Sequence, residues 1–228
     1  MDDDAFGLAD YRQRVAAMYL APPLDGAAGA AAFRAARDQL FREHPQSPLE
    51  PAARATFTGL RHFDYDDRYR VPATFVPHPD RSPCEIDTGG ADGTVRCRRL
   101  GRLVTGFGDL TLFWITGYGG GLFLPLRDAT SGRATSGGGT SGGGTSGGGT
   151  YGGGTYGGGT YGGGRYLVDT VKGTFGRALT GQGDQLIIDF NYAYNPSCAY
   201  NDRYACPLAP RENWLPTEIC AGEQVFGR

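Results

Sequence analysis

Lysine and histidine are scarce in this chain, and no segment concentrates positive charge. Lys172 is the only lysine among 22 basic residues, which stand against 24 acidic ones for a net charge of -2. The arginines are scattered along the chain, so the sequence lacks the basic footprint of a protein that binds nucleic acid or anionic lipid. We therefore predict no nucleic-acid partner and no membrane partner.

Long apolar runs and a basic leader are missing as well. The chain begins with Asp2, Asp3 and Asp4, the opposite of a secretory leader, and its longest largely apolar run is Leu110 to Ile115. Neither secretion nor membrane spanning is supported. The five cysteines are an odd number in a chain without a leader, which favours reduced thiols over a disulfide framework. We expect a cytoplasmic protein.

Glycine, by contrast, is abundant because of one repeat. From 135 to 164 the chain reads Thr-Ser-Gly-Gly-Gly three times and Thr-Tyr-Gly-Gly-Gly three times, which places 18 of the 39 glycines there. Such a period buries almost nothing, so we predict a flexible loop between two strands. Lengthening a loop by two doublings costs only about 1.2 kcal/mol. Once this loop is set aside, the remaining length is that of one ordinary domain, so we predict a single domain over residues 1–228.

Helical periodicity is confined to the first part of the chain. Leu8, Tyr11, Val15, Met18 and Tyr19 recur at spacings of three and four, before Pro22-Pro23. A second apolar stripe follows and ends at His44-Pro45; its residues are Phe33, Ala36, Arg37, Leu40 and Phe41. Both patterns indicate amphipathic helices that pack against another surface.

After Phe57, short β-branched and aromatic runs alternate with turn residues, which is typical of an antiparallel β protein. The predicted fold is mainly β (α+β): an antiparallel β-barrel or rolled β-sandwich with two N-terminal helices packed against it. The predicted strands are 69–76, 94–105, 109–116, 121–126, 165–171 and 185–192. Gly117 to Gly121 is expected to be a turn, because no Gly-Lys-Ser/Thr follows as a phosphate loop requires.

The last forty residues carry the densest chemistry. In a strand from Gln185 to Tyr192, Asp189 and Asn191 share one face, which either meets solvent or lines the mouth of a barrel. The tyrosines that follow need hydrogen-bond partners, so this cluster is either a tie for the loop or a ligand pocket. The candidate ligand-binding residues are Asp128, Arg165, Asp189, Asn191, Tyr194, Asn195, Cys198 and Glu212.

No residue set in this block completes a metal or catalytic signature. Cys198 and Cys206 are too far apart in sequence for a zinc knuckle, and the three histidines are isolated, so we expect neither a metal nor a cofactor. A catalytic thiol needs a base, which Asp189, Glu212 or Glu223 would have to supply by tertiary contact; the alternative is packed free thiols.

With these residues in view, the chain resembles the DUF1684 family, an uncharacterised bacterial and archaeal group. The matching stretches are 47–49, 57–60, 63–66, 122–132, 161–167, and 189–200 with Cys206, Glu212-Asn213 and Ala221 to Glu223. The chain departs from the family in the repeat, which is ordinarily a single unit, and near residue 80. The resemblance implies no established activity.

Two functions remain as hypotheses. The first is small-molecule binding in a polar pocket at one end of the barrel, with hydrolase or transferase chemistry as an extension. The second is a non-enzymatic structural or interaction protein whose C-terminal polar cluster is a hydrogen-bond network. Neither the ligand nor the oligomeric state follows from the sequence.

Overall fold

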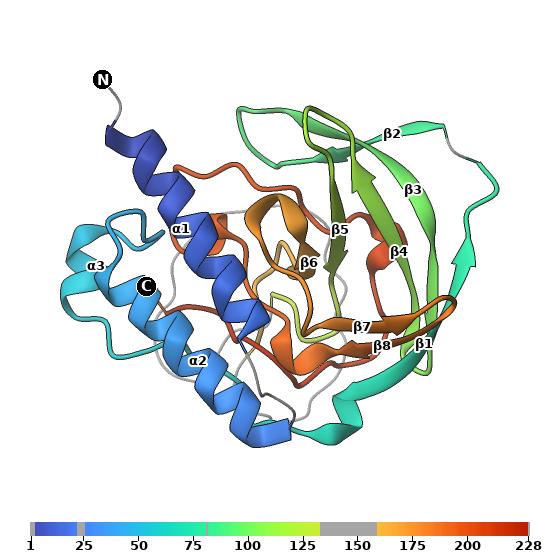
Figure 1. Ribbon diagram of the computed structural model, residues 1–228, viewed down its shortest axis with the longest axis horizontal. Helices are drawn as coiled ribbons and strands as arrows, with labels where there is room; N and C mark the ends of the chain where they lie inside the picture. Colours follow the sequence, from blue (N-terminus) through green and yellow to red (C-terminus); the bar gives the residue numbers. More distant parts are fainter. Residues whose placement is uncertain (1–2, 22–25, 81, 133–158, 228) are drawn as a thin grey trace.

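Helices and sheet occupy opposite sides of the molecule (Figure 1). The computed structural model describes residues 3–21, 26–80, 82–132 and 159–227. Helices α1 (Asp3–Leu20), α2 (Gly26–Glu43) and the short α3 (Pro51–Ala55) gather on one side of the sheet. No helix within these ranges is both long enough and apolar enough to cross a membrane.

The two long helices are amphipathic, as their periodicity predicts. Helix α1 buries Val15, Met18 and Tyr19, and α2 buries Phe33 and Leu40 within the same core. The ring of Phe33 meets Tyr19 and Tyr192 edge to face. Aromatic contacts of this kind add to the stabilisation that burial provides. The helices therefore cover the core side of the sheet.

The sheet is one antiparallel surface that curves as a half-barrel. Its strand order is β6-β5-β4-β3-β1-β8-β7, with β2 paired to β3 beside this path. The bounds are β1 Arg70–Pro77, β2 Pro83–Asp87, β3 Thr94–Thr105, β4 Gly108–Ile115, β5 Gly121–Leu126, β6 Arg165–Asp169, β7 Leu179–Gln182 and β8 Gln185–Asp189. The predicted mainly β, α+β fold with N-terminal helices is confirmed.

The strands β5 and β6 frame the repeat. Leu126 at the end of β5 is paired with Arg165 at the start of β6. The chain between them therefore leaves the sheet and returns to it at neighbouring positions. Near its return, Thr160 pairs with Ser131 in an isolated bridge, which fixes the last unit of the repeat on the fold. The predicted flexibility of residues 135–164 falls mostly on residues 133–158, which lie outside the described residues.

Two of the predicted strands are too long. The strand predicted over 185–192 ends at Asp189, whose carboxylate accepts a hydrogen bond from the Asn191 amide and caps the 3-10 turn Phe190–Tyr192. The strand predicted over 165–171 ends at Asp169, where the turn Thr170–Lys172 begins. Strands β2 and β7 are absent from the prediction.

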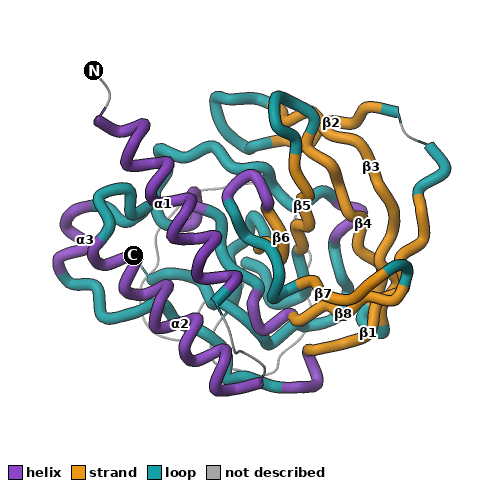
Figure 2. Tube along the Cα trace, viewed as in Figure 1, coloured by secondary structure: helices purple, strands orange, loops and turns teal. Residues whose placement is uncertain are grey.

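Beyond β8 the chain has little regular structure, and it passes between the sheet and the helices (Figure 2). Tyr194 extends the edge of β6 through two backbone hydrogen bonds with Tyr166, of 2.8 and 3.0 Å. Glu223 then donates its amide to Ala193 O at 2.8 Å. The segment after β8 thus fills the interior of the half-barrel instead of forming a separate tail.

Candidate functional site

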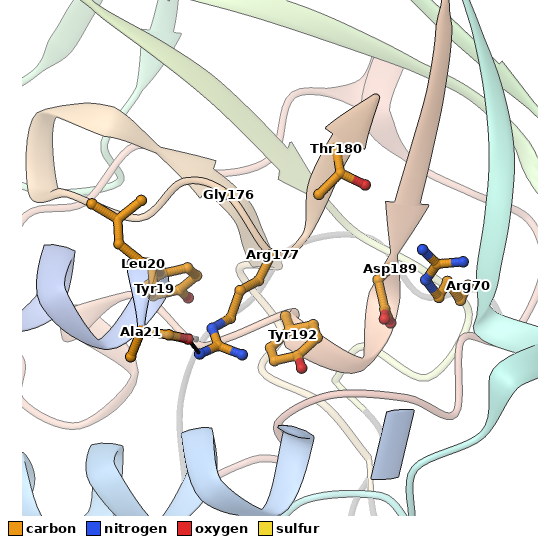
Figure 3. A pocket seen from close by; sticks show the side chains of 9 residues that line it. All are labelled: Tyr19, Leu20, Ala21, Arg70, Gly176, Arg177, Thr180, Asp189 and Tyr192. Carbon is orange, nitrogen blue, oxygen red and sulfur yellow. Dashed lines mark hydrogen bonds between the residues drawn. The ribbon is translucent and has the colours of Figure 1, made fainter. Parts of the chain in front are cut away.

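A pocket of about 380 Å³ lies where the end of α1 meets strands β1, β7 and β8 (Figure 3). Arginine, carboxylate, hydroxyl and phenol groups line it. The lining residues are Tyr19, Leu20, Ala21, Arg70, Gly176, Arg177, Thr180, Asp189 and Tyr192. Its size falls within the range of pockets that hold small molecules.

The strand register brings the first two charges together. Arg70 begins β1 and Asp189 ends β8, and the two residues are direct partners in the antiparallel ladder. Arg70 is exposed, whereas Asp189 is buried. Opposite charges at paired positions attract each other, so this end of the ladder presents a guanidinium at the rim of the pocket and a carboxylate deeper in it.

Asn191 fixes the carboxylate of Asp189. Asp189 Oδ1 accepts hydrogen bonds from the Asn191 backbone N and from Asn191 Nδ2, both at 2.9 Å. The Asn191 side chain also binds the backbone of Asp66. Asn191 Oδ1 accepts a hydrogen bond from Asp66 N at 3.1 Å, and Asn191 Nδ2 donates one to Asp66 O at 2.9 Å. Burial raises the pKa of Asp189, although the Asn191 hydrogen bonds and Arg70 oppose that shift. Burial therefore makes ionisation of Asp189 less favourable than it is in water.

Arg177 supplies the opposite wall of the pocket. Its Nε donates to Met18 O at 3.2 Å and its Nη2 to Ala21 O at 2.8 Å, so the guanidinium caps the last carbonyls of α1. The same group lies 5.6 Å from the ring centres of Phe33 and Tyr192. A cation near a helix C-terminus and over aromatic faces is held by both interactions. Arg177 is therefore anchored with its positive charge at the pocket.

Asp128 and Arg165 lie elsewhere, in an ion pair with no solvent exposure of either side chain. Arg165 Nη2 donates to Asp128 Oδ2 at 2.8 Å and to Ile219 O at 3.1 Å. Its Nη1 binds Ala221 O and, at 3.3 Å, Glu223 O. These contacts tie residues 219–223 to the start of β6.

Asn195 belongs to a second buried network, centred on Glu223. Arg37 donates to Glu223 Oε2 through Nε at 3.2 Å and Nη2 at 3.0 Å. Asn195 Nδ2 donates to Glu223 Oε1 at 3.2 Å, and the Tyr200 hydroxyl binds the same oxygen. The guanidinium of Arg37 stacks 5.1 Å from the Tyr194 ring centre. This network joins α2 to the C-terminal segment.

Glu212 contacts neither of these networks. Its carboxylate receives three hydrogen bonds from Arg99, of 2.7 to 3.1 Å, and one from the Thr111 hydroxyl at 2.9 Å. Burial raises the pKa of Glu212, but these hydrogen bonds outweigh burial and hold it below its usual value. The residue thus attaches the 3-10 turn Arg211–Asn213 to β3 and β4.

The structure therefore divides the predicted site residues. It joins Asp128 to Arg165 and Asp189 to Asn191, and it places Asn195 and Tyr194 against the Arg37–Glu223 pair. Glu212 and Cys198 occupy separate positions, and of the predicted residues only Asp189 lines the pocket of Figure 3. Ligand binding by the predicted set stays a prediction.

Sequence reasoning missed Arg70, Arg177 and Tyr19. Their proximity depends on the β1–β8 register and on how α1 ends, neither of which leaves a local motif. Within the described residues, no group of three or more His, Cys, Asp or Glu side chains is placed to hold a metal ion.

Comparison with known proteins shows what the chain resembles. The family model described as "Protein of unknown function (DUF1684)" matches residues 55–141 and 150–224. A solution NMR structure of an uncharacterised protein from Haloarcula marismortui is 35% identical, with a TM-score of 0.54 over 85% of this chain and 91% of that one. No curated protein matches the chain.

Proposed function

The chain belongs to the DUF1684 family of proteins of unknown function, and we propose that it binds a small carboxylate-bearing molecule in the pocket between α1, β1, β7 and β8. The observation that carries this proposal is the convergence of Arg70, Arg177 and Asp189 on one pocket. Guanidinium groups bind carboxylates through charge-assisted, often bidentate hydrogen bonds, and an amino or hydroxyl group of the same ligand would suit the carboxylate of Asp189.

The charges of the pocket support this choice of ligand. Two arginines and one carboxylate leave an excess of positive charge, which favours a ligand with net negative charge or a zwitterion. The volume of about 380 Å³ suits a compact metabolite. Asp189, with its raised pKa, is the group that would transfer a proton in any hydrolase or transferase step.

The alternative hypothesis, a structural hydrogen-bond network, applies best to a different part of the chain. Arg37, Glu223, Asp128 and Arg165 are buried and bound to one another or to backbone carbonyls, so they are inaccessible to a ligand. We assign the C-terminal polar cluster to support of the fold, and the pocket beside α1 to binding.

The binding proposal is tested with thermal-shift and calorimetric titrations of amino acids, hydroxy acids and dicarboxylates. A ligand at a hundred times its dissociation constant adds about 2.7 kcal/mol. For a chain of this size that corresponds to roughly 5–10 °C in the thermal midpoint. Arg70→Gln should abolish the shift. Arg102 is an exposed arginine of β3 paired with Asp109, so the control variant Arg102→Gln should leave the shift intact.

Asp189→Asn separates the two hypotheses for this residue. The amide oxygen still accepts from Asn191, and removal of a disfavoured charge should leave stability unchanged or slightly raised while ligand binding is lost. A variant that is clearly destabilised, together with a panel that never shifts the wild type, would assign Asp189 to the structural network instead.

A further inference from the structure

A second pocket, of about 710 Å³, lies beside α3 and shares no residue with the pocket of Figure 3. Three segments that are far apart in the sequence meet there: α3 with the turn that follows it, the segment after β8, and residues 226–227. Its lining includes Glu50, Phe57, Arg61, Tyr200, Asn201 and Phe226. The volume is within the range of pockets that hold small molecules.

Three of the residues that line this pocket are aromatic. The ring centre of Phe226 lies 6.4 Å from that of Phe57 and 5.5 Å from that of Tyr200. The buried Phe41 of α2 supports them, with its ring centre 6.3 Å from Phe57 and 5.0 Å from Tyr200. The Tyr200 hydroxyl is bound to Glu223, so Tyr200 offers the pocket its ring and not its hydroxyl. Rings supported in this way present a surface on which a flat aromatic ligand can stack.

Asn201 carries a hydrogen-bond donor without a partner at this pocket. The side chain is 5% exposed, and three of its residue's four polar atoms are satisfied. Asn201 N donates to Ser197 O at 3.2 Å, its carbonyl accepts from Tyr204 N at 3.2 Å, and its Oδ1 accepts from Arg203 N at 3.0 Å. Its buried Nδ2 meets no acceptor within the described part of the chain. An unpaired buried donor costs stability, which a ligand oxygen would restore.

The charged residues of this pocket do not favour an anion. Glu50, Asp202 and Arg61 are exposed members of its lining, so two carboxylates stand against one guanidinium. The balance is opposite to that of the pocket in Figure 3, where two arginines outnumber one carboxylate. Glu50 precedes α3, and its carboxylate does not cap the helix. Glu50 can therefore accept hydrogen bonds from hydroxyl groups of a neutral ligand.

We propose that this pocket binds a neutral nucleoside whose base carries a ring carbonyl. The base stacks on the aromatic residues, its carbonyl oxygen accepts a hydrogen bond from Asn201 Nδ2, and the sugar hydroxyls lie toward Glu50. Nδ2 is closed to solvent in the free protein, so binding includes a small shift of the exposed Asp202 and Arg203 that follow it. An amino group in place of the carbonyl would set one donor against another. Asn201 is therefore the residue that selects between bases.

Calorimetric titration of the full chain with matched nucleosides tests the choice of ligand. Inosine and adenosine share a sugar and a purine ring, but inosine carries a carbonyl where adenosine carries an amino group. We expect inosine to bind at millimolar or lower concentration and adenosine about tenfold more weakly, because a buried donor is left unpaired. Inosine monophosphate should bind no more tightly than inosine, since the pocket has no excess of positive charge. The proposal is overturned if inosine does not bind, if adenosine binds equally well, or if the monophosphate binds more tightly.

NMR spectra of isotope-labelled protein locate the bound nucleoside. The side-chain amide signal of Asn201, assigned through its backbone, should move when inosine is added. A ligand of the pocket in Figure 3 would leave this signal in place, so the measurement separates the two sites. An Asn201 signal that inosine does not move overturns the proposal.

Two variants assign the contacts. Asn201→Asp keeps an oxygen for Arg203 N but replaces the donor with an acceptor, and it should lower the affinity for inosine by about tenfold or more. Phe226→Ala removes a stacking ring and should lower the affinity by about fivefold or more. Phe175 is a partly exposed phenylalanine outside this pocket, so the control Phe175→Ala should bind inosine like the wild type. Unchanged affinity in Phe226→Ala overturns the proposal even if Asn201→Asp does not fold.

Discussion

Removal of the Arg37 charge should destabilise the protein in a way that depends on pH. Arg37 and Glu223 have side-chain exposures of 5% and 1%, so Arg37→Met would leave the carboxylate buried without its cation. An uncompensated buried charge costs about 3–5 kcal/mol. Glu223 can limit this loss of stability by taking up a proton, which neutralises its buried carboxylate.

The size of the loss follows from that proton. From an ordinary pKa of 4.5, protonation at pH 7 costs about 1.4 kcal/mol per pH unit, or about 3.4 kcal/mol in all. In Arg37→Met the folded state keeps this proton above pH 4.5 and the unfolded state does not, so stability should rise as pH falls, by about 1.4 kcal/mol per unit. Burial already raises the pKa of Glu223 in the wild type, even with Arg37 beside it.

Thermal and urea unfolding at several values between pH 5 and pH 8 measure the effect. We expect the thermal midpoint of Arg37→Met to fall by roughly 10 °C at pH 7. Most of that loss should be recovered at pH 5, and the double variant with Glu223→Gln should regain part of it at every pH. Arg42 is an exposed arginine of the same helix, so Arg42→Met controls for the effect of the substitution on helix propensity. A loss under about 1 kcal/mol, or one equal at pH 5 and pH 8, would refute the reasoning.

Two further outcomes are expected. Gly222→Ala should lower the free energy of unfolding, measured in urea, by about 1–3 kcal/mol, because φ is +75° and a Cβ would lie 2.5 Å from Ala193 O. The control Gly106→Ala, where a Cβ would meet open space, should be neutral. Equal losses in the two variants would contradict this explanation. Deletion of Thr135 to Gly159, which leaves one repeat unit, should preserve folding, and a large fall in thermal midpoint would show instead that the repeat is structural.

The elements with strong periodicity were predictable from the sequence, and the weak ones were not. Helices α1 and α2 and strands β3, β4 and β5 follow their apolar patterns closely. Strand β2 contains Pro83, Cys84 and Glu85 and pairs only with β3, so no alternation distinguishes it from a loop. Strand β7 is four residues long and includes Gly181, which weakens any strand signal.

The polar networks show a similar division. Asp189 and Asn191 are close in sequence, and their contact was predictable even though the strand ends between them. The pairing of Arg37 with Glu223 spans 186 positions and leaves no local trace. One signal was present: Arg37 lies on the apolar stripe of its helix, and an arginine in that position indicates a buried partner. The pocket residues Arg70 and Arg177 carry no comparable signal.

The contacts of residues 219–224 also set a constraint on biosynthesis. The Glu223 carboxylate and the carbonyls that hold Arg165 are translated after every helix and strand of the sheet. Until they emerge from the ribosome, α2 carries a cation that its burial site cannot accept. We therefore expect the nascent chain to remain protease-sensitive until these residues are translated, with helix docking among the last events of maturation.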